Sequence, residues 1–362
     1  MKLSFISSNA IQNAMRQTFR QTQNQMMDAS QEATTGVYAD IGLALGGNTA
    51  QSVDLTREVT RIDAITGSNS IVTQRLSSSQ QALTGMSSQA QTLLDQLVGL
   101  SGNQDSSSIQ LAQQTSAAAL QSLGSYANTM VNGEYLFSGI NTDVKPFTDN
   151  SGPATTSILN ALDTYMSTNG VASMSDLTSD QMTDFVTTVV EPMFSDDSQP
   201  APDNWASWSS ASSQNMSSRI SNSEVVESST NINEPGMRYF ALASIVTSAL
   251  MGPITDTSSP LAGQSLSADA RAALSTKAIS YTRQAIDGLT NQQAQLGLSE
   301  SRVSKANDAL SAQKDIIQNR VLDLQGVDKE EAATKVNSLQ TQLETAYTIV
   351  SKIQQLSLVN YL

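Results

Sequence analysis

Few residues in this chain could do chemistry, because the sequence contains no histidine and no cysteine. Their absence removes imidazole bases, thiol nucleophiles and thiolate metal ligands. Ser311 and Lys314 have the S-x-x-K spacing of serine acyl-transfer enzymes, but the companion S-D-N and K-T-G sequences are missing. Because the pair falls inside a helical pattern, we interpret both residues as solvent-facing helix positions and expect no catalytic residue.

Two further patterns could bind ligands, and neither is complete. The neighbouring acids Asp196 and Asp197 could hold a cation weakly, but the spaced oxygen ligands and central glycine of an EF-hand are absent. Gly46 and Gly47 are not followed by the Gly-Lys-Ser/Thr of a phosphate-binding loop. We therefore expect no metal site, no cofactor and no enzymatic activity.

The charge of the chain is negative and unevenly distributed. The net charge is −14, which argues against nucleic acid and anionic membranes as partners. Residues 141–235 hold 13 acidic and only two basic side chains. No segment is apolar over a transmembrane length, so we expect no membrane insertion. Residues 1–9 lack the apolar run of a Sec signal peptide, so export would need another route.

The prolines divide the chain into three parts. All eight lie between residues 146 and 260, and more than a hundred residues on each side contain none. Because proline breaks helix interiors, this distribution predicts helical first and last parts around an irregular insert. Aromatic residues make up only 5% of the chain, which favours thin helical bundles over a thick globular core.

A long apolar stripe, which we call the seam, marks the first helical part. It comprises twelve positions at strict three- and four-residue spacing, of which ten are apolar. These positions are Ile62, Ile65, Asn69, Val72, Leu76, Ser79, Leu83, Met86, Ala90, Leu93, Leu97 and Leu100. The last part repeats the pattern every seven residues from Leu289 to Leu324, breaks at residues 326–328 and resumes from Val336 to Ile353.

Local signals refine this outline. A second helix is predicted over residues 106–131, with Asn132-Gly133 as its C-terminal cap. Thr178 and Gln181 form a capping-box pattern that opens a helix ending before Pro192. Residues 158–166 are predicted to form a short helix, and alternation within residues 216–231 predicts a hairpin.

The expected fold is mainly α, a long antiparallel coiled coil or helical bundle built by the N- and C-terminal parts. We predict terminal assembly helices at 1–40 and 336–362, and a helical rod domain at 41–140 and 266–335. Residues 141–265 would form an inserted, acidic, exposed α+β domain.

The two ends of the chain carry very little charge. Between residues 336 and 362 only Glu344 and Lys352 are charged. Uncharged polar faces can be buried without stranding an ion, whose desolvation costs several kcal/mol. We expect these ends to be covered by copies of the same chain and to become ordered on assembly. In the alternative interpretation, the two ends pair only with each other as a two-helix tail.

We predict that the apolar side chains of both ends mediate subunit assembly. These residues are Phe5, Ile6, Ile11, Met15, Phe19, Leu339, Leu343, Val350, Ile353, Leu356, Leu358 and Tyr361.

Several patches of the sequence resemble flagellin-like proteins, and most of all the hook-associated junction family that joins hook to filament. The most specific resembles the family's Gly-X-Tyr-Leu-Phe…Pro-Phe pattern, and its residues are Gly133, Tyr135, Leu136, Phe137, Pro146 and Phe147. Other matches are the start with Ser8-Asn9 and the turn at residues 32–36, residues 295–297 with 327–332, and the end at residues 342–362. After Gly36 the family's acidic pair before proline is missing.

The resemblance implies a structural subunit of the bacterial flagellum that supports motility. It implies export through the flagellar type III channel without a cleaved signal, and assembly outside the cell as a ring. The implied partners are copies of itself, another hook-associated protein, flagellin and a cytoplasmic export chaperone. The chaperone would bind the stripe at Leu343, Val350 and Ile353.

Three alternatives stay open from the sequence. The chain could be flagellin, the filament subunit itself. It could be a coiled-coil signalling rod, although such a rod would be expected to have a transmembrane segment and to lack a proline-rich insert. A carboxylate enzyme in the insert would need paired acids in a cleft, whereas the acids here are scattered.

Overall fold

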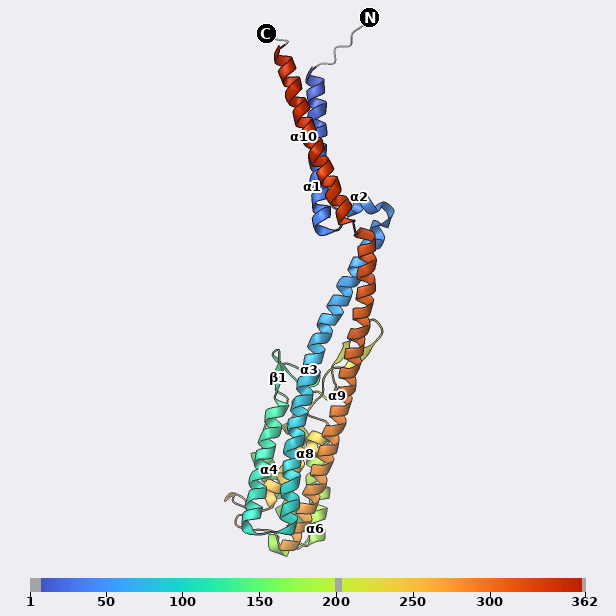
Figure 1. The fold of residues 1–362 in the computed structure, drawn as a ribbon. Coiled ribbons are helices and arrows are strands. Elements are labelled where there is room, and N and C mark those ends of the chain that lie inside the picture. Colours follow the sequence, from blue (N-terminus) through green and yellow to red (C-terminus); the bar gives the residue numbers. More distant parts are fainter. Residues whose placement is uncertain (1–7, 199–203, 360–362) are drawn as a thin grey trace. The chain divides into compact units, whose positions relative to one another are not determined.

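The computed structural model describes residues 8–198 and 204–359, and the chain divides into two compact units. One unit comprises residues 1–65 and 308–362, and the other comprises residues 66–307. Helices account for most of both units (Figure 1). The predicted mainly α fold, with long helices from both ends of the chain and a mixed insert, is confirmed.

The first unit, which we call the terminal unit, consists of helices, short connecting segments and one isolated antiparallel bridge in its described part. Its helices α1 and α10 lie side by side along their length (Figure 1). The break between α9 and α10 falls at residues 326–328, as the sequence predicted. The elements of this unit are α1 (Ser8–Thr35), α2 (Ile41–Leu45), the 3₁₀ turn η1 (Gly46–Asn48), the start of α3 (Thr49–Gly102), the end of α9 (Ala268–Gln325) and α10 (Lys329–Val359).

The second unit, which we call the core unit, contains most of α3 and α9 together with the insert. Its remaining elements are α4 (Ser106–Ala127), β1 (Met130–Val131), β2 (Glu134–Tyr135), α5 (Ser151–Thr168), η2 (Met174–Asp176), α6 (Ser179–Phe185), the π-helical turn η3 (Val186–Val190), α7 (Glu191–Ser195), η4 (Trp205–Ser207), β3 (Ser217–Arg219), β4 (Val225–Glu227) and α8 (Pro235–Leu250). The strands form two separate antiparallel pairs, β1–β2 and β3–β4.

The predicted seam is buried. Eleven of its twelve positions are buried in the structure, and the remaining one, Ile65, is half-buried. On α9 the heptad positions Leu289, Leu296 and Val303 are also buried. Hydrogen bonds from Gln293 to Thr84 and from Gln80 to Glu300 fix the antiparallel pairing of α3 with α9 at the margin of the seam.

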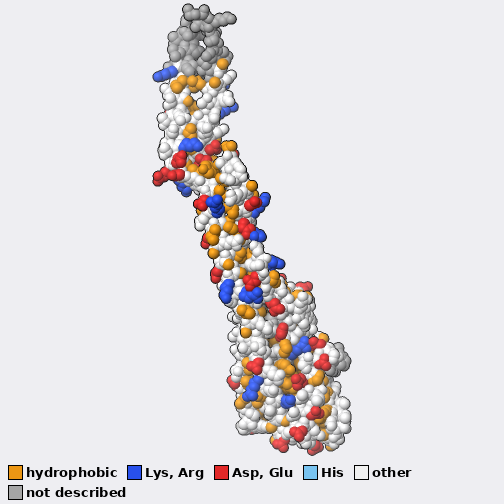
Figure 2. Space-filling model, turned by 90° about the vertical axis from the view of Figure 1, so that its right-hand side faces the viewer, with side chains coloured by type: hydrophobic (Ala, Val, Ile, Leu, Met, Phe, Trp, Pro, Cys, Tyr) orange, Lys and Arg blue, Asp and Glu red, His pale blue; other side chains and the backbone are white. Residues whose placement is uncertain are grey.

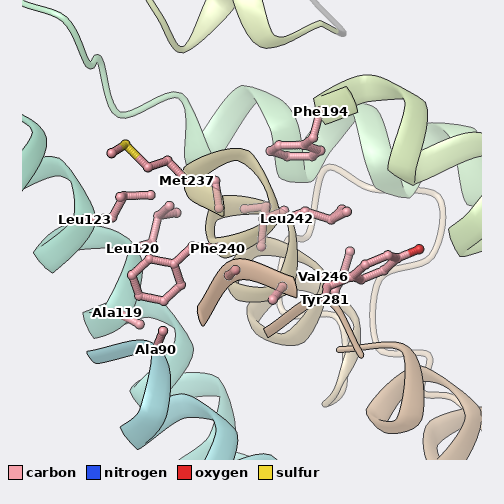
Figure 3. Close-up of a cluster of buried hydrophobic side chains, with 14 of the residues drawn as sticks. Ala90, Ala119, Leu120, Leu123, Phe194, Met237, Phe240, Leu242, Val246 and Tyr281 are labelled. Carbon is pink, nitrogen blue, oxygen red and sulfur yellow. The ribbon is translucent and has the colours of Figure 1, made fainter. Parts of the chain in front are cut away.

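The centre of the core unit is helix α8, which the sequence analysis did not identify. Figure 3 shows Met237, Phe240, Leu242 and Val246 of α8 among side chains from α3, α4, α7 and α9. Most residues of α8 are buried, because its sequence is apolar on nearly every side. The insert therefore supplies the middle of the core, while the predicted division into three domains stays a prediction.

The aromatic residues of the insert form one cluster beside α8. The rings of Trp205 and Trp208 stack at 6.4 Å, and both are buried against Phe147 and Phe194. The guanidinium of Arg238 lies over the Trp205 ring, 5.5 Å from its centroid. Both tryptophans thus pack within the insert.

Two of the local predictions are confirmed, and two are wrong. The capping box at Thr178 and the β3–β4 hairpin are confirmed. Asn132-Gly133 is not a helix cap, because α4 ends at Ala127 and the two residues form the β1–β2 turn with φ values of 53° and 85°. Positive φ at both positions is the geometry that favours Asn-Gly in tight hairpins. Pro192 does not end a helix either, since it lies in the first turn of α7, where proline is tolerated.

Helices α8 and α9 cross at a pair of glycines. A Cβ added to Gly288 would lie 2.5 Å from the Cα of Gly236, and a Cβ on Gly236 would lie 2.7 Å from the backbone nitrogen of Leu289. Only glycine allows the two backbones to approach this closely.

Replacing Gly288 with alanine should lower the free energy of unfolding by about 1–3 kcal/mol, because the two backbones must separate. Thermal unfolding followed by circular dichroism measures the effect. Gly99→Ala on α3 is the matched control, since a Cβ there would meet no atom within 4 Å. The control should gain about 0.5–1 kcal/mol. An unchanged midpoint for Gly288→Ala would contradict the interpretation.

Tyr165 should make the core unit sensitive to alkali. Burial and the hydrogen bond that its phenol donates to Asp184, at 2.8 Å, raise the pKa of Tyr165 to about 12. The unfolded chain releases this proton near pH 10, so the contribution is complete below that pH and is lost as the pH rises toward 12. Urea unfolding at pH 9 to 12 should show the stability advantage of the parent over Tyr165→Phe shrinking. A constant difference would disprove the coupling.

Candidate subunit interface

The inner face of the α1–α10 pair is apolar and closed. Phe19 of α1 and Tyr347 of α10 meet edge to face, with ring centroids 4.5 Å apart. Nearer the end of α1 and the start of α10, Ala29, Leu339 and Leu343 are buried. The two ends of the chain therefore pair with each other in the single subunit.

The base of this pair is tied by backbone hydrogen bonds. The Tyr38 amide donates to the Gln325 carbonyl at 3.0 Å, and the Val327 amide donates to the Gly36 carbonyl at 2.9 Å. Gly36 has a φ of 78°, and the Lys329 side chain crosses it where a Cβ would stand. The residues at the start of α10 are thus fixed to those just after α1.

The outer face of the pair remains uncovered. Met27 on α1 is 60% exposed and Ile349 on α10 is 42% exposed, while Tyr347, at the rim beside Phe19, is 57% exposed. Figure 2 shows that the described surface of this pair is mostly white, with few charged side chains. The uncharged stretches of this surface can be buried without desolvating an ion.

The predicted assembly residues lie mainly on the inner face. Leu339 and Leu343 are buried there, while Met15, Phe19 and Val350 are half-buried. The side chains of Phe5, Ile6, Ile11, Ile353, Leu356, Leu358 and Tyr361 lie outside the described residues. Sequence reasoning missed Met27, Tyr347 and Ile349, because a heptad stripe identifies the positions that meet the partner helix and not those that face outward.

The residues of the Tyr-Leu-Phe pattern form part of the core. Leu136 and Phe137 are fully buried, and Pro146 and Phe147 are buried beside them. Tyr135 is half-buried and Gly133 is exposed at the hairpin turn. These residues therefore hold the β1–β2 hairpin against the helices.

A buried arginine clamps this hairpin. The guanidinium of Arg75 on α3 donates to Glu134 at 2.6 Å and to the Tyr135 carbonyl at 2.8 Å. Burial lowers the pKa of Arg75, and the charge of Glu134 opposes this shift. The hydrogen bond to the carbonyl satisfies a backbone group that the short hairpin cannot pair internally.

The described residues offer little for catalysis or metal binding. The Lys314 ammonium forms an ion pair with Asp63 at 2.6 Å, and Ser311 is exposed on α9. No group of three or more acidic residues in the described part of the chain could hold a metal ion. None of the helices described is both long and apolar enough to cross a membrane.

Both helical ends of the chain match known family models. Residues 6–142 match the bacterial flagellin N-terminal helical region, and residues 279–362 match the bacterial flagellin C-terminal helical region. The chain belongs to the flagellin-like proteins. It is therefore a structural subunit of the flagellum, which lies outside the cell. Its uncovered α1–α10 face is a candidate contact for neighbouring subunits of this flagellin-like protein.

A solved structure from Vibrio parahaemolyticus, described as a flagellar hook-associated protein, shares the fold. The TM-score is 0.51 at 11% identity, over 77% of this chain and 97% of that chain. At this identity the likeness concerns the fold alone. A search of curated proteins found no match.

Replacing Arg75 with methionine should loosen the hairpin, because the Tyr135 carbonyl keeps only the Ser138 hydroxyl as a donor and Glu134 loses its ion pair. We expect a loss of about 1–3 kcal/mol and faster amide exchange in β1 and β2. The matched control is Arg57→Met, which breaks an ion pair with Asp54 whose side chains are 76% and 73% exposed. That change should cost less than about 1 kcal/mol. Equal effects of the two substitutions would refute the clamp.

Proposed function

We propose that this flagellin-like subunit forms the junction between hook and filament by packing its α1–α10 pair against copies of itself. The observation that carries the proposal is the uncovered outer face, on which the large apolar side chains of Met27, Tyr347 and Ile349 are exposed among amides and hydroxyls. The Tyr-Leu-Phe pattern and the shared fold with a protein described as hook-associated favour the junction over the filament.

Burial of the outer face by a neighbouring subunit would stabilise the contact. Apolar burial contributes roughly 25 cal/mol per Å², and the amides and hydroxyls of the outer face can pair with those of a neighbour. A charged face would lose several kcal/mol for each ion left unpaired on burial. The outer face therefore favours association with a surface as weakly charged as its own.

The remaining partners follow from the resemblance. The subunit would contact another hook-associated protein on one side and flagellin on the other, after export through the type III channel. A cytoplasmic export chaperone would hold the stripe at Leu343 and Val350. In this chain that stripe faces α1, so chaperone binding and pairing with α1 would exclude each other.

The filament subunit is the second candidate function, because the models that match both helical ends are those of bacterial flagellin. The same two matches set the coiled-coil signalling rod aside. Electron microscopy of cells lacking this gene separates the remaining two. Hooks without filaments, with flagellin shed into the medium, support the junction. Normal filaments contradict it, and naked hooks with no shed flagellin indicate the filament subunit.

Two neighbouring residues on α10 distinguish contact between subunits from pairing within the subunit. Ile349→Asp places a charge on the outer face, so it should block incorporation into flagella while leaving the helical circular dichroism of the subunit unchanged. Val350→Asp places the charge against α1, so it should also reduce the helical signal. Normal incorporation of the Ile349→Asp subunit would disprove the proposed contact.

A further inference from the structure

Two methionines of the described chain are prominently exposed, and they differ in their surroundings. Met27 on α1 is 60% exposed and Met130 on the β1–β2 hairpin is 48% exposed. Core methionines such as Met86 and Met237 are fully buried. A thioether reacts with oxidants according to its access to solvent, and Met27 and Met130 are the most exposed methionines of the described residues.

The side chain of Met27 points away from α10, the helix that pairs with α1 in the same subunit. It lies two residues before the buried Ala29, which is about 200° of rotation on an α-helix and so the opposite face. One turn to either side of Met27 stand Gln23, Asn24, Ser30 and Gln31, which are all uncharged. Within this stretch of the outer face, Met27 is the large apolar side chain that a neighbouring subunit would bury.

We propose that Met27 is an oxidation site that controls self-association of the subunit. A peroxide transfers one oxygen atom to Sδ of Met27, the O–O bond breaks, and the second oxygen leaves as water or an alcohol. The sulfur is oxidised to the sulfoxide and the peroxide is reduced. The product is polar and chiral, and an apolar contact built on the thioether is lost.

This inference rests on the proposed function, because it requires that a second copy covers the outer face. Oxidation is then possible for the free subunit and hindered in the assembled one. The modification acts before incorporation and is reversible, since methionine sulfoxide reductases return the thioether.

Hydrogen peroxide applied to the purified full chain tests the proposal. Mass spectrometry of peptides locates the added oxygen, and sedimentation velocity over a concentration series measures self-association. Oxidation at Met27 should raise the concentration needed for association about tenfold, as expected for burying one unpaired polar group. The rate at which peroxide oxidises Met27 should fall at least several-fold in the assembled protein, because burial removes access to the sulfur.

Met27→Leu preserves an apolar side chain that peroxide cannot oxidise, and Met130→Leu is the matched control. After peroxide, the Met27→Leu subunit should associate as before treatment, while the Met130→Leu subunit should lose association as the parent does. Reductase treatment should restore the parent.

The inference is overturned if the Met27→Leu subunit loses association after peroxide, or if the parent oxidised at Met27 still associates normally. Failure of the untreated parent to associate would count against the proposed function instead, so the two failures are distinct.

Discussion

Burial of the apolar seam between α3 and α9 is the interaction on which the rest of this structure depends. Neither helix has a second long partner over its whole described length, so the seam must be continuous to hold them together. In the core unit α4 and α8 pack onto the same stripe, and the Gly236–Gly288 crossing lets α8 reach its centre. The insert is therefore stabilised by the helices between which it is inserted, and it stabilises them in turn.

The insert and the α1–α10 pair differ in the charge of their surfaces. The insert carries most of the net negative charge, and its Arg238 is held by an ion pair with Asp197 and by the ring of Trp205. The α1–α10 pair gathers several exposed charges near its base, at Glu330, Glu331 and Lys335, and presents mostly amides, hydroxyls and a few apolar side chains farther along α10. Negative charges on the inserts of two neighbouring molecules repel each other. The uncharged stretches of the α1–α10 pair can be buried at low electrostatic cost.

The sequence predicted the long helices and the inner faces well, for a definite reason. Heptad spacing from Ile62 to Leu100 reports where a helix meets its partner, and burial along α3 confirms it. Helix α8 escaped notice because it is apolar on nearly all sides and so has no stripe, and it lies among prolines. Asn132-Gly133 was misassigned because the same dipeptide can end a helix or turn a hairpin. The sequence indicated which helices form the candidate interface but not which of their residues face outward. Periodicity selected Leu339 and Leu343, which face α1, whereas the outward positions follow no repeat.

The backbone tie between Val37 and Gly326 brings α1 and α10 back along one another, so Ser8 and Val359 lie at the same end of the pair (Figure 1). Fluorescent labels or affinity peptides fused to either end would crowd one spot on the surface we expect to be shared. The exposed turn at Gly170, which follows α5 in the core unit, offers a place for such insertions that leaves this spot free.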